Sequence, residues 1–185
     1  MIGCREYFDG FQQALEQCIS KRVHQKGFIE IIKLLKATKK NRKKIILIGN
    51  GGSSAIAEHM AIDLTKNAGL RAIAFSGTPL ITTLSNDYGY ELAFSKAIES
   101  YADRKDVLIA ISSGGQSKNI LNACKAAKQK GVTVITFSGF KADNPLRKIG
   151  KVNIWVDSKS YGYVELIHNF LIHYINDEII GKVVY

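Results

Sequence analysis

The sequence predicts an α/β fold: a five-stranded parallel sheet with helices on both faces, preceded by two N-terminal helices. Short apolar runs alternate with helical patterns along most of the 185 residues, which is typical of parallel sheets buried on both faces. Two of these runs end in Gly/Ser-rich loops that open into a helix. Hydrophobic residues make up 46% of the chain and both prolines lie outside the expected strands, so one complete core can form.

The first 37 residues predict two amphipathic helices. Apolar residues recur at helical spacing in residues 2–37, and we place the break between the two helices at Gly27. The apolar positions are Phe8, Phe11, Leu15, Ile19, Phe28, Ile31, Ile32, Leu34 and Leu35. Such helices often pack on something else, and a partner subunit is one candidate. We expect residues 1–40 to be a helical extension of a single domain that spans residues 1–185.

Strands and helices then alternate. The expected strands are residues 45–48, 71–75, 107–111, 132–137 and 152–156. Helices are expected after the first strand to about Lys66, after the third strand to Lys130, and from about Tyr163 to Ile180. No linker, internal repeat or low-complexity segment interrupts this order. Because ligands bind at the carboxyl ends of strands in open parallel sheets, both Gly/Ser-rich loops fall where a ligand is expected.

The net charge of +10 predicts a surface that attracts anions such as nucleic acid, acidic lipid or phosphorylated metabolites. Much of this charge lies in residues 36–44, which we interpret as a solvated turn before a buried strand. No zinc finger and no interleaving of aromatic and basic residues indicates a nucleic-acid reader. No apolar run is long enough to span a bilayer, and no signal peptide is recognised. We therefore expect a cytoplasmic protein without nucleic-acid or membrane partners.

The three cysteines, Cys4, Cys18 and Cys124, are odd in number and far apart. A disulfide framework or a cysteine-based zinc site is therefore not expected. Cys124 falls in a helical pattern and is most simply a small core residue.

The first loop, residues 49–54 (GNGGSS), joins a strand to a helix. Glycines let the backbone approach a ligand, and a helix N-terminus presents free N–H groups to an anion. Ser53 or Ser54 could cap the helix or donate to a ligand. The loop has neither the Walker A nor the GxGxxG pattern, and alone it could be a turn with a cap. The second loop, residues 112–117 (SSGGQS), repeats the arrangement, and two such loops favour a phosphate site.

Histidines and carboxylates form a second candidate set. His59 and Asp63 are four residues apart on one expected helix, while Glu165 and His173 are two turns apart on another. This set suits a Zn²⁺ site or acid/base chemistry, and each histidine could equally be an ordinary half-buried residue. His168, on the last helix, is interpreted as structural.

Three motifs in order resemble those of phosphoheptose isomerases. They are residues 49–53 (GNGGS), 85–91 (SNDYGYE) and 111–117 (ISSGGQS), and the resemblance extends from about residue 44 to residue 176. The third motif also marks the wider sugar isomerase (SIS) fold. The resemblance implies a flavodoxin-like three-layer α/β/α SIS fold.

The resemblance also implies roles for the loop residues. Ser112, Ser113 and Ser117 would hold the sugar phosphate, although the family commonly has a further hydroxyl residue where this chain has Gly114. The implied substrate contacts are Asn50, Gly51, Gly52, Ser53, Asn86, Asp87, Ser112, Ser113, Gly114 and Ser117.

His59 and His173 match family histidines that bind zinc or move protons. Asp63 stands where the family usually has a glutamate that serves as base, and Glu165 where it usually has a glutamine. Aspartate is one methylene shorter, and misplacing a base by about 1 Å can cost about a hundredfold in rate. The resemblance therefore implies Asp63 or Glu165 as base, His173 as the second proton-transfer group, and Zn²⁺ held by His59, Asp63, Glu165 and His173.

The activity implied is isomerisation of sedoheptulose 7-phosphate to glycero-manno-heptose 7-phosphate, which supplies activated heptose for lipopolysaccharide or capsule. No nucleotide or redox cofactor is expected. The family implies a homotetramer with active sites at subunit interfaces. Alternatives are a non-catalytic SIS protein that binds a replication initiator, an isomerase of another sugar phosphate, and a DNA-binding regulator, for which the region before the first strand is too short.

Overall fold

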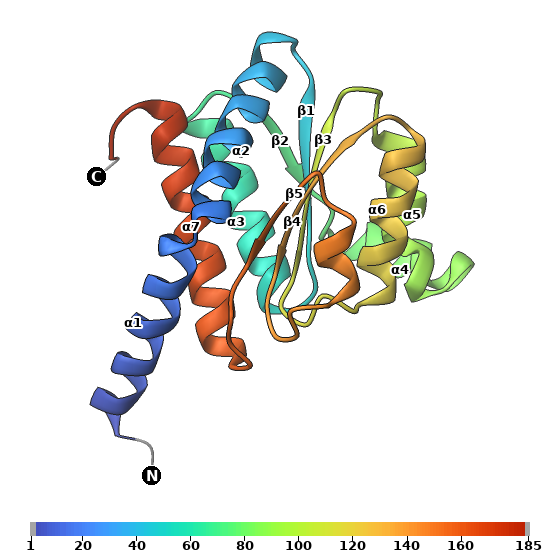
Figure 1. Ribbon diagram of the computed structural model, residues 1–185. Coiled ribbons are helices and arrows are strands. Elements are labelled where there is room, and N and C mark those ends of the chain that lie inside the picture. The colour runs from blue at the N-terminus through green and yellow to red at the C-terminus, as the bar shows by residue number, and fades with distance from the viewer. Residues whose placement is uncertain (1–2, 184–185) are drawn as a thin grey trace.

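A computed structural model describes residues 3–183 (Figure 1). Residues 1, 2, 184 and 185, including Ile2 at the start of the first expected helix, lie outside this description. The elements are α1 (Cys4–Ser20), α2 (Arg22–Lys40), β1 (Lys44–Ile48), α3 (Gly52–Lys66), β2 (Arg71–Ala74), α4 (Thr78–Tyr88), α5 (Tyr90–Tyr101), β3 (Val107–Ser112), α6 (Lys118–Gln129), β4 (Thr133–Ser138), the 3₁₀ helix η1 (Pro145–Lys148), β5 (Val152–Trp155) and α7 (Tyr161–Ile180).

The five strands form one parallel sheet in the order β2-β1-β3-β4-β5, which confirms the expected fold class. The strand order reverses between β1 and β3, because β1 connects outward to β2 while β3 continues toward β4. A crevice forms at such a switch point, outside the carboxyl ends of the strands. The two Gly/Ser-rich loops follow β1 and β3 and therefore border it.

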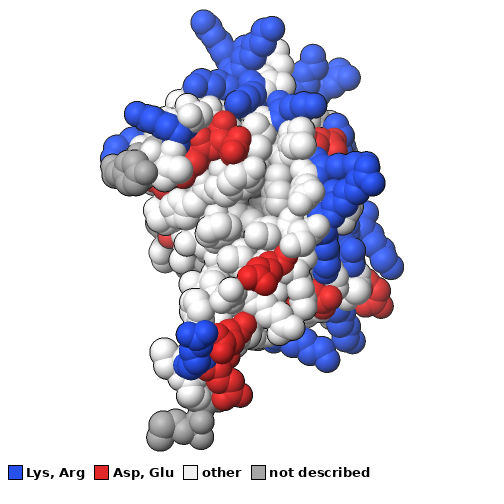
Figure 2. Space-filling model, turned by 60° about the vertical axis from the view of Figure 1, so that its left-hand side comes forward, with Lys and Arg blue, Asp and Glu red and all other residues white. Residues whose placement is uncertain are grey.

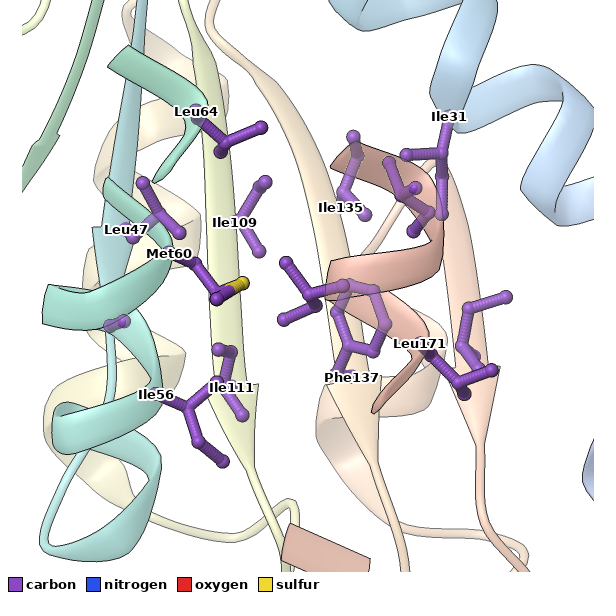
Figure 3. Packing of buried hydrophobic residues seen from close by; sticks show 14 of the residues in the cluster. Ile31, Leu47, Ile56, Met60, Leu64, Ile109, Ile111, Ile135, Phe137 and Leu171 are labelled. Atoms are coloured by element: carbon purple, nitrogen blue, oxygen red, sulfur yellow. The ribbon is translucent and has the colours of Figure 1, made fainter. Parts of the chain in front are cut away.

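Each sheet face is covered by helices, as alternating side chains in a buried parallel strand require. Ile45 and Leu47 of β1 point to the face covered by α1, α2, α3 and α7, while Ile46 and Ile48 point to the face covered by α5 and α6. Figure 3 shows the first of these cores, where Met60 of α3, Ile109 of β3 and Leu171 of α7 pack between the sheet and two helices. This packing fixes α3 and α7 beside each other.

The two N-terminal helices are present, but the predicted break at Gly27 is wrong. The helices separate at Lys21, which has extended backbone, and Gly27 lies inside α2. A Cβ at Gly27 would come within 3.2 Å of the side chains of Val152 and Ile154 on β5. The glycine therefore lets α2 pack closely on the sheet edge. Helix α1 points away from the body of the molecule (Figure 1).

Helices α4 and α5 were not anticipated from the sequence pattern, and neither was η1. Gly89 ends α4 with φ +82°, and α5 begins at the next residue. No residue of α4 is fully buried, and its short apolar stripe, Leu80, Ile81 and Leu84, packs only partly on the core. The segment between β2 and β3 is thus helical rather than loop.

The basic stretch before β1 is a turn only at residues 41–43: Lys36, Lys39 and Lys40 lie in the last turns of α2, and Lys44 begins β1, so the expected turn is shorter than the charge pattern suggested. Lys44 pairs with Asp103 at 2.6 Å and with Asp106 at 2.7 Å, and Lys39 donates to the carbonyl of Ala68 at 2.6 Å. Among the helices in residues 3–183, none combines the length and apolar character needed to cross a bilayer.

Candidate active site

The loop after β3 forms a polar cradle at the start of α6. Ser112 and Ser113 are buried, and Ser112 Oγ lies 3.4 Å from Ser117 Oγ. Gly115 has φ +63°, and a Cβ there would collide with the side chain of Asn144, so the turn requires glycine. The buried Ser113 Oγ has no hydrogen-bond partner among the described residues. Because an unpaired buried hydroxyl is costly, this atom indicates a polar ligand.

This cradle opens into a pocket of about 540 Å³. Its walls are Asn50, Ser53, Ser112, Ser113, Gly114, Gln116, Ser117, Phe140, Lys141, Tyr161 and Glu165. Hydroxyl groups and a helix N-terminus at one end suit a phosphate group. The structure therefore brings the serine loop together with Asn50 and Ser53 of the first loop.

The first loop is held in place by a side-chain network. Gly51 has φ +52° and ψ −123°, a conformation that non-glycine residues avoid. The amides of Asn50 and Asn119 exchange hydrogen bonds of 3.0 and 2.9 Å, and the Tyr90 hydroxyl donates to Asn50 Oδ1 at 2.8 Å. These contacts fix the orientation of the Asn50 amide and leave one of its N–H groups free.

Asn86 and Asp87, which were expected to contact the substrate, do not line the serine pocket of their own chain. Both are exposed at the end of α4, where Asn86 Nδ2 donates to Asp87 Oδ1 at 3.0 Å. From the same motif, Tyr90 reaches the site through Asn50. Gly51 lines a smaller pocket with Tyr90, and Gly52 lines the groove beside the histidines.

Three of the four expected metal ligands come together between α3 and α7. Asp63 Oδ2 lies 3.4 Å from His59 Nε2 and 3.7 Å from His173 Nδ1, and the two imidazole rings meet edge to face with centroids 5.1 Å apart. The ligand atoms of the three residues lie within 4.8 Å of one another. Glu165 is not part of this group.

The three residues fit a zinc ion. Around a tetrahedral Zn²⁺ with bonds of about 2.0–2.2 Å, neighbouring ligand atoms lie about 3.3–3.6 Å apart. The Asp63–His59 contact, at 3.4 Å, falls within that spacing, and the Asp63–His173 contact, at 3.7 Å, lies just above it. Two imidazoles and one carboxylate leave a fourth position open, as in catalytic zinc sites. The same arrangement also suits proton transfer among three groups.

Glu165 lies between the serine pocket and the histidines. It lines the serine pocket and also a groove of about 420 Å³ that includes His59. A Cβ on Gly52 would collide with the Glu165 carboxylate, so that carboxylate sits against the first residue of α3. Negative charge is favoured at a helix N-terminus.

The two imidazoles contact each other but border different grooves. His59 lines the groove shared with Glu165, and His173 lines another of about 530 Å³ with Phe170 and Tyr174. Both grooves open onto the exposed side of α7. The large apolar side chains exposed there are Leu166 (52%), Phe170 (49%) and Tyr174 (40%). Figure 2, which brings the α1 and α7 side forward, shows a broad uncharged area with most Lys and Arg at its margins.

Two other histidines are buried and structural. His168 is fully buried, its Nε2 lies 3.2 Å from the Ser138 carbonyl, and burial lowers its pKa to about 4. Burial also lowers the pKa of His24, whose Nε2 accepts from the Trp155 N–H at 3.3 Å and so ties α2 to β5. The interpretation of His168 as structural agrees with this placement.

Sequence reasoning missed several residues at the site. Asn119 and Tyr90 orient Asn50, while Phe140, Lys141 and Tyr161 line the serine pocket. Tyr90 lies within the motif of residues 85–91, and Asn119 follows the motif of residues 111–117 by two positions. Their proximity to these motifs could have marked them as site residues. The residues after β4 showed no pattern, although they also follow the carboxyl end of a strand.

Comparison with known proteins agrees with this geometry. The SIS domain profile matches residues 6–139, a span that includes both loops. A phosphoheptose isomerase of Campylobacter concisus is 36% identical over 170 residues, covering 88% of this chain and 89% of that protein. A solved phosphoheptose isomerase from Neisseria gonorrhoeae has a TM-score of 0.88 at 30% identity over 96% of each chain. One from Francisella tularensis has the same TM-score and coverage at 26% identity.

Proposed function

This chain belongs to the SIS domain family and, within it, to the phosphoheptose isomerases, and from that premise we propose that it converts sedoheptulose 7-phosphate to glycero-manno-heptose 7-phosphate. The product would enter the synthesis of activated heptose for lipopolysaccharide or capsule, and the reaction would take place in the cytoplasm. The observation that best supports this is the position of Glu165, which lines both the serine pocket and the groove of His59. A sugar held by its phosphate at Ser113 can therefore extend past Glu165 toward His59.

The reaction needs a base, a partner for the developing oxyanion and a remote phosphate grip. A carboxylate removes a proton from the carbon beside the carbonyl, and the electron pair moves to the oxygen to give an enediolate. The proton returns at the neighbouring carbon. We propose Glu165 as this base, with Asp63 as the alternative, because no hydrogen bond involves the Glu165 carboxylate within the described chain. His173 would move the hydroxyl proton between the two oxygens if it does not hold a metal ion; as a Zn²⁺ ligand it would leave that transfer to another group.

We propose that His59, Asp63 and His173 hold Zn²⁺, with Glu165 as a further ligand only if its side chain moves. A bound Zn²⁺ supplies a Lewis acid that stabilises negative charge on a carbonyl oxygen. Serine hydroxyls and the α6 N-terminus hold the phosphate, so that its binding energy orients the reacting carbons.

The test is turnover of sedoheptulose 7-phosphate by metal-loaded protein, followed by aldose detection. Glu165→Gln is expected to lower kcat by about 10²–10⁴-fold, the range for losing a general base. Asp63→Asn is expected to lower kcat too, because it removes the charge that lies beside both imidazoles. Activity that survives both substitutions would refute the assignment of the base.

We further propose that residues 1–185 form one domain that assembles as a homotetramer with its sites at subunit interfaces. Residues 1–40 would contribute to the interface, since α1 extends from the body and exposes Tyr7 and Phe8. The grooves of His59 and His173 open beside Leu166, Phe170 and Tyr174, so a neighbouring subunit could close them. Light scattering measures the mass, and Phe170→Glu should give a smaller particle.

The alternative is a non-catalytic SIS protein that binds a partner such as a replication initiator. Its support is the pair of departures at Asp63 and Glu165, where the family usually has glutamate and glutamine. Absence of turnover with sedoheptulose 7-phosphate, in protein that still binds inorganic phosphate, would favour a binding protein or an isomerase of another sugar phosphate.

A further inference from the structure

The turn after β4 forms one side of the serine pocket, although no motif indicated it. Phe140 and Lys141 line the pocket opposite the serine loop. The two loops are joined by backbone hydrogen bonds, from Gly139 N–H to the Ser113 carbonyl at 2.9 Å and from Leu146 N–H to the Gly115 carbonyl at 3.0 Å. The turn is therefore a fixed wall of the site.

A buried asparagine organises this wall. Asn144 is 1% exposed, and its Nδ2 donates to the carbonyls of Gly139 at 3.1 Å and Lys141 at 2.8 Å. Phe140 has φ +57°, which is uncommon for a non-glycine residue, and its ring packs edge to face on Tyr161 with centroids 4.8 Å apart. These contacts fix the backbone at Lys141, so its side chain starts from a defined point at the edge of the pocket.

Without Lys141, the residues that line the pocket would carry a net negative charge, from Glu165. Glu165 is the one acidic residue among the lining residues, and Lys141 is the one basic residue. Lys118, at the start of α6, already pairs with Glu91 at 2.9 Å. No ion pair or side-chain hydrogen bond occupies the Lys141 ammonium within residues 3–183. A cation would strengthen the binding of a phosphate dianion in a pocket that also holds Glu165, and Lys141 is the basic residue of its lining.

Gly114 leaves room for a further phosphate contact on this side of the pocket. The serine loop has no side chain at that position, and a Cβ built there would meet only the Phe140 ring, at 3.8–4.0 Å. The side of the cradle that faces Phe140 and Lys141 therefore offers no hydroxyl donor from residue 114.

We propose that Lys141 is a phosphate-binding residue of this chain, which supplies from the β4 turn the contact that a hydroxyl at position 114 would make. This inference rests on the proposed function, since it assigns the phosphate end of the same pocket. It places the recognition of the sugar phosphate on two loops, those after β3 and β4.

The test measures binding of inorganic phosphate by calorimetry and turnover of sedoheptulose 7-phosphate. Lys141→Met should weaken phosphate binding and raise KM about tenfold, the low end for losing a charge-assisted hydrogen bond, because the lysine is exposed. Lys148→Met, the matched control, removes an exposed charge on η1 outside the pocket and should change both by less than about twofold. Lys141→Arg should retain most of the affinity.

Rescue separates phosphate binding from a structural role. Gly114→Ser has room beside Phe140, so adding it to Lys141→Met should recover several-fold of the lost phosphate affinity. Equal phosphate affinity in wild type, Lys141→Met and Lys148→Met would overturn the inference while leaving the pocket intact. A wild-type protein that neither binds phosphate nor turns over the sugar phosphate would instead overturn the proposed function.

Discussion

Protonation of His168 should destabilise the protein in mild acid. The imidazole is fully buried, lies against Phe137 and contacts the Ser138 carbonyl, and its folded-state pKa of about 4 compares with an ordinary value of 6.5. Between these values the unfolded chain binds more protons than the folded chain, so stability rises with pH. The contribution is intact above about pH 6.5 and is lost as the pH falls toward 4. Full protonation corresponds to about 3 kcal/mol, and pH 5 to about 2 kcal/mol.

Urea unfolding of wild type and His168→Gln at pH 7.5 and pH 5 measures this effect. The glutamine does not titrate, so the loss of unfolding free energy on acidification should be about 2 kcal/mol smaller in the variant. Some dependence remains, because burial also lowers the pKa of His24. Identical pH dependence in wild type and His168→Gln would refute the reasoning.

Two further predictions concern thiols and the serine turn. Burial raises the pKa of Cys18 to about 11 and of Cys124 to about 12, whereas Cys4 is exposed. A disulfide reagent at pH 8 should therefore react rapidly with Cys4 alone in the folded protein and with all three thiols in denaturant. Rapid reaction of a second thiol in the folded protein would contradict this. Gly115→Ala should lower the free energy of unfolding by about 1–3 kcal/mol, because Gly115 has positive φ and a Cβ there would collide with Asn144. Gly114→Ala should leave the free energy of unfolding nearly unchanged. Equal changes in melting temperature for the two variants would contradict this.

The parallel sheet could be predicted because its strands are apolar on both faces. Ile45 to Ile48 are all buried, alternately toward each helical layer, so the run has no polar interruption. The N-terminal break could not be placed, since Gly27 is explained by contact with Val152 and Ile154, far away in the chain. Helix α4 was missed because its contact with the core is small: Leu80, Ile81 and Leu84 are only partly buried, and none of its residues is fully buried.

The candidate site also has residues that could be predicted from the sequence and residues that could not. The serine loop could be predicted because its glycines and hydroxyls are contiguous, and the structure agrees that Ser112, Ser113 and Ser117 converge. Lys141 lies on a turn organised by Asn144, and neither residue belongs to a recognisable motif. Its place in the pocket depends on the strand order, which brings the ends of β3 and β4 together.

The aspartate at position 63 does not break up the histidine cluster. Its shorter side chain still places Oδ2 within 3.4 and 3.7 Å of the two imidazole nitrogens, so the lost methylene is compensated within the cluster. That same placement puts the Asp63 carboxylate in contact with both imidazoles, whereas no such contact involves Glu165 among the described residues, and the proposal of Glu165 as base follows from this difference. Glu165 lies eight residues before His173 on α7, about 12 Å along the helix, and faces the serine pocket. The two carboxylates thus occupy different places: Asp63 lies with the imidazoles, and Glu165 lines the serine pocket, where the proposed function puts the sugar phosphate.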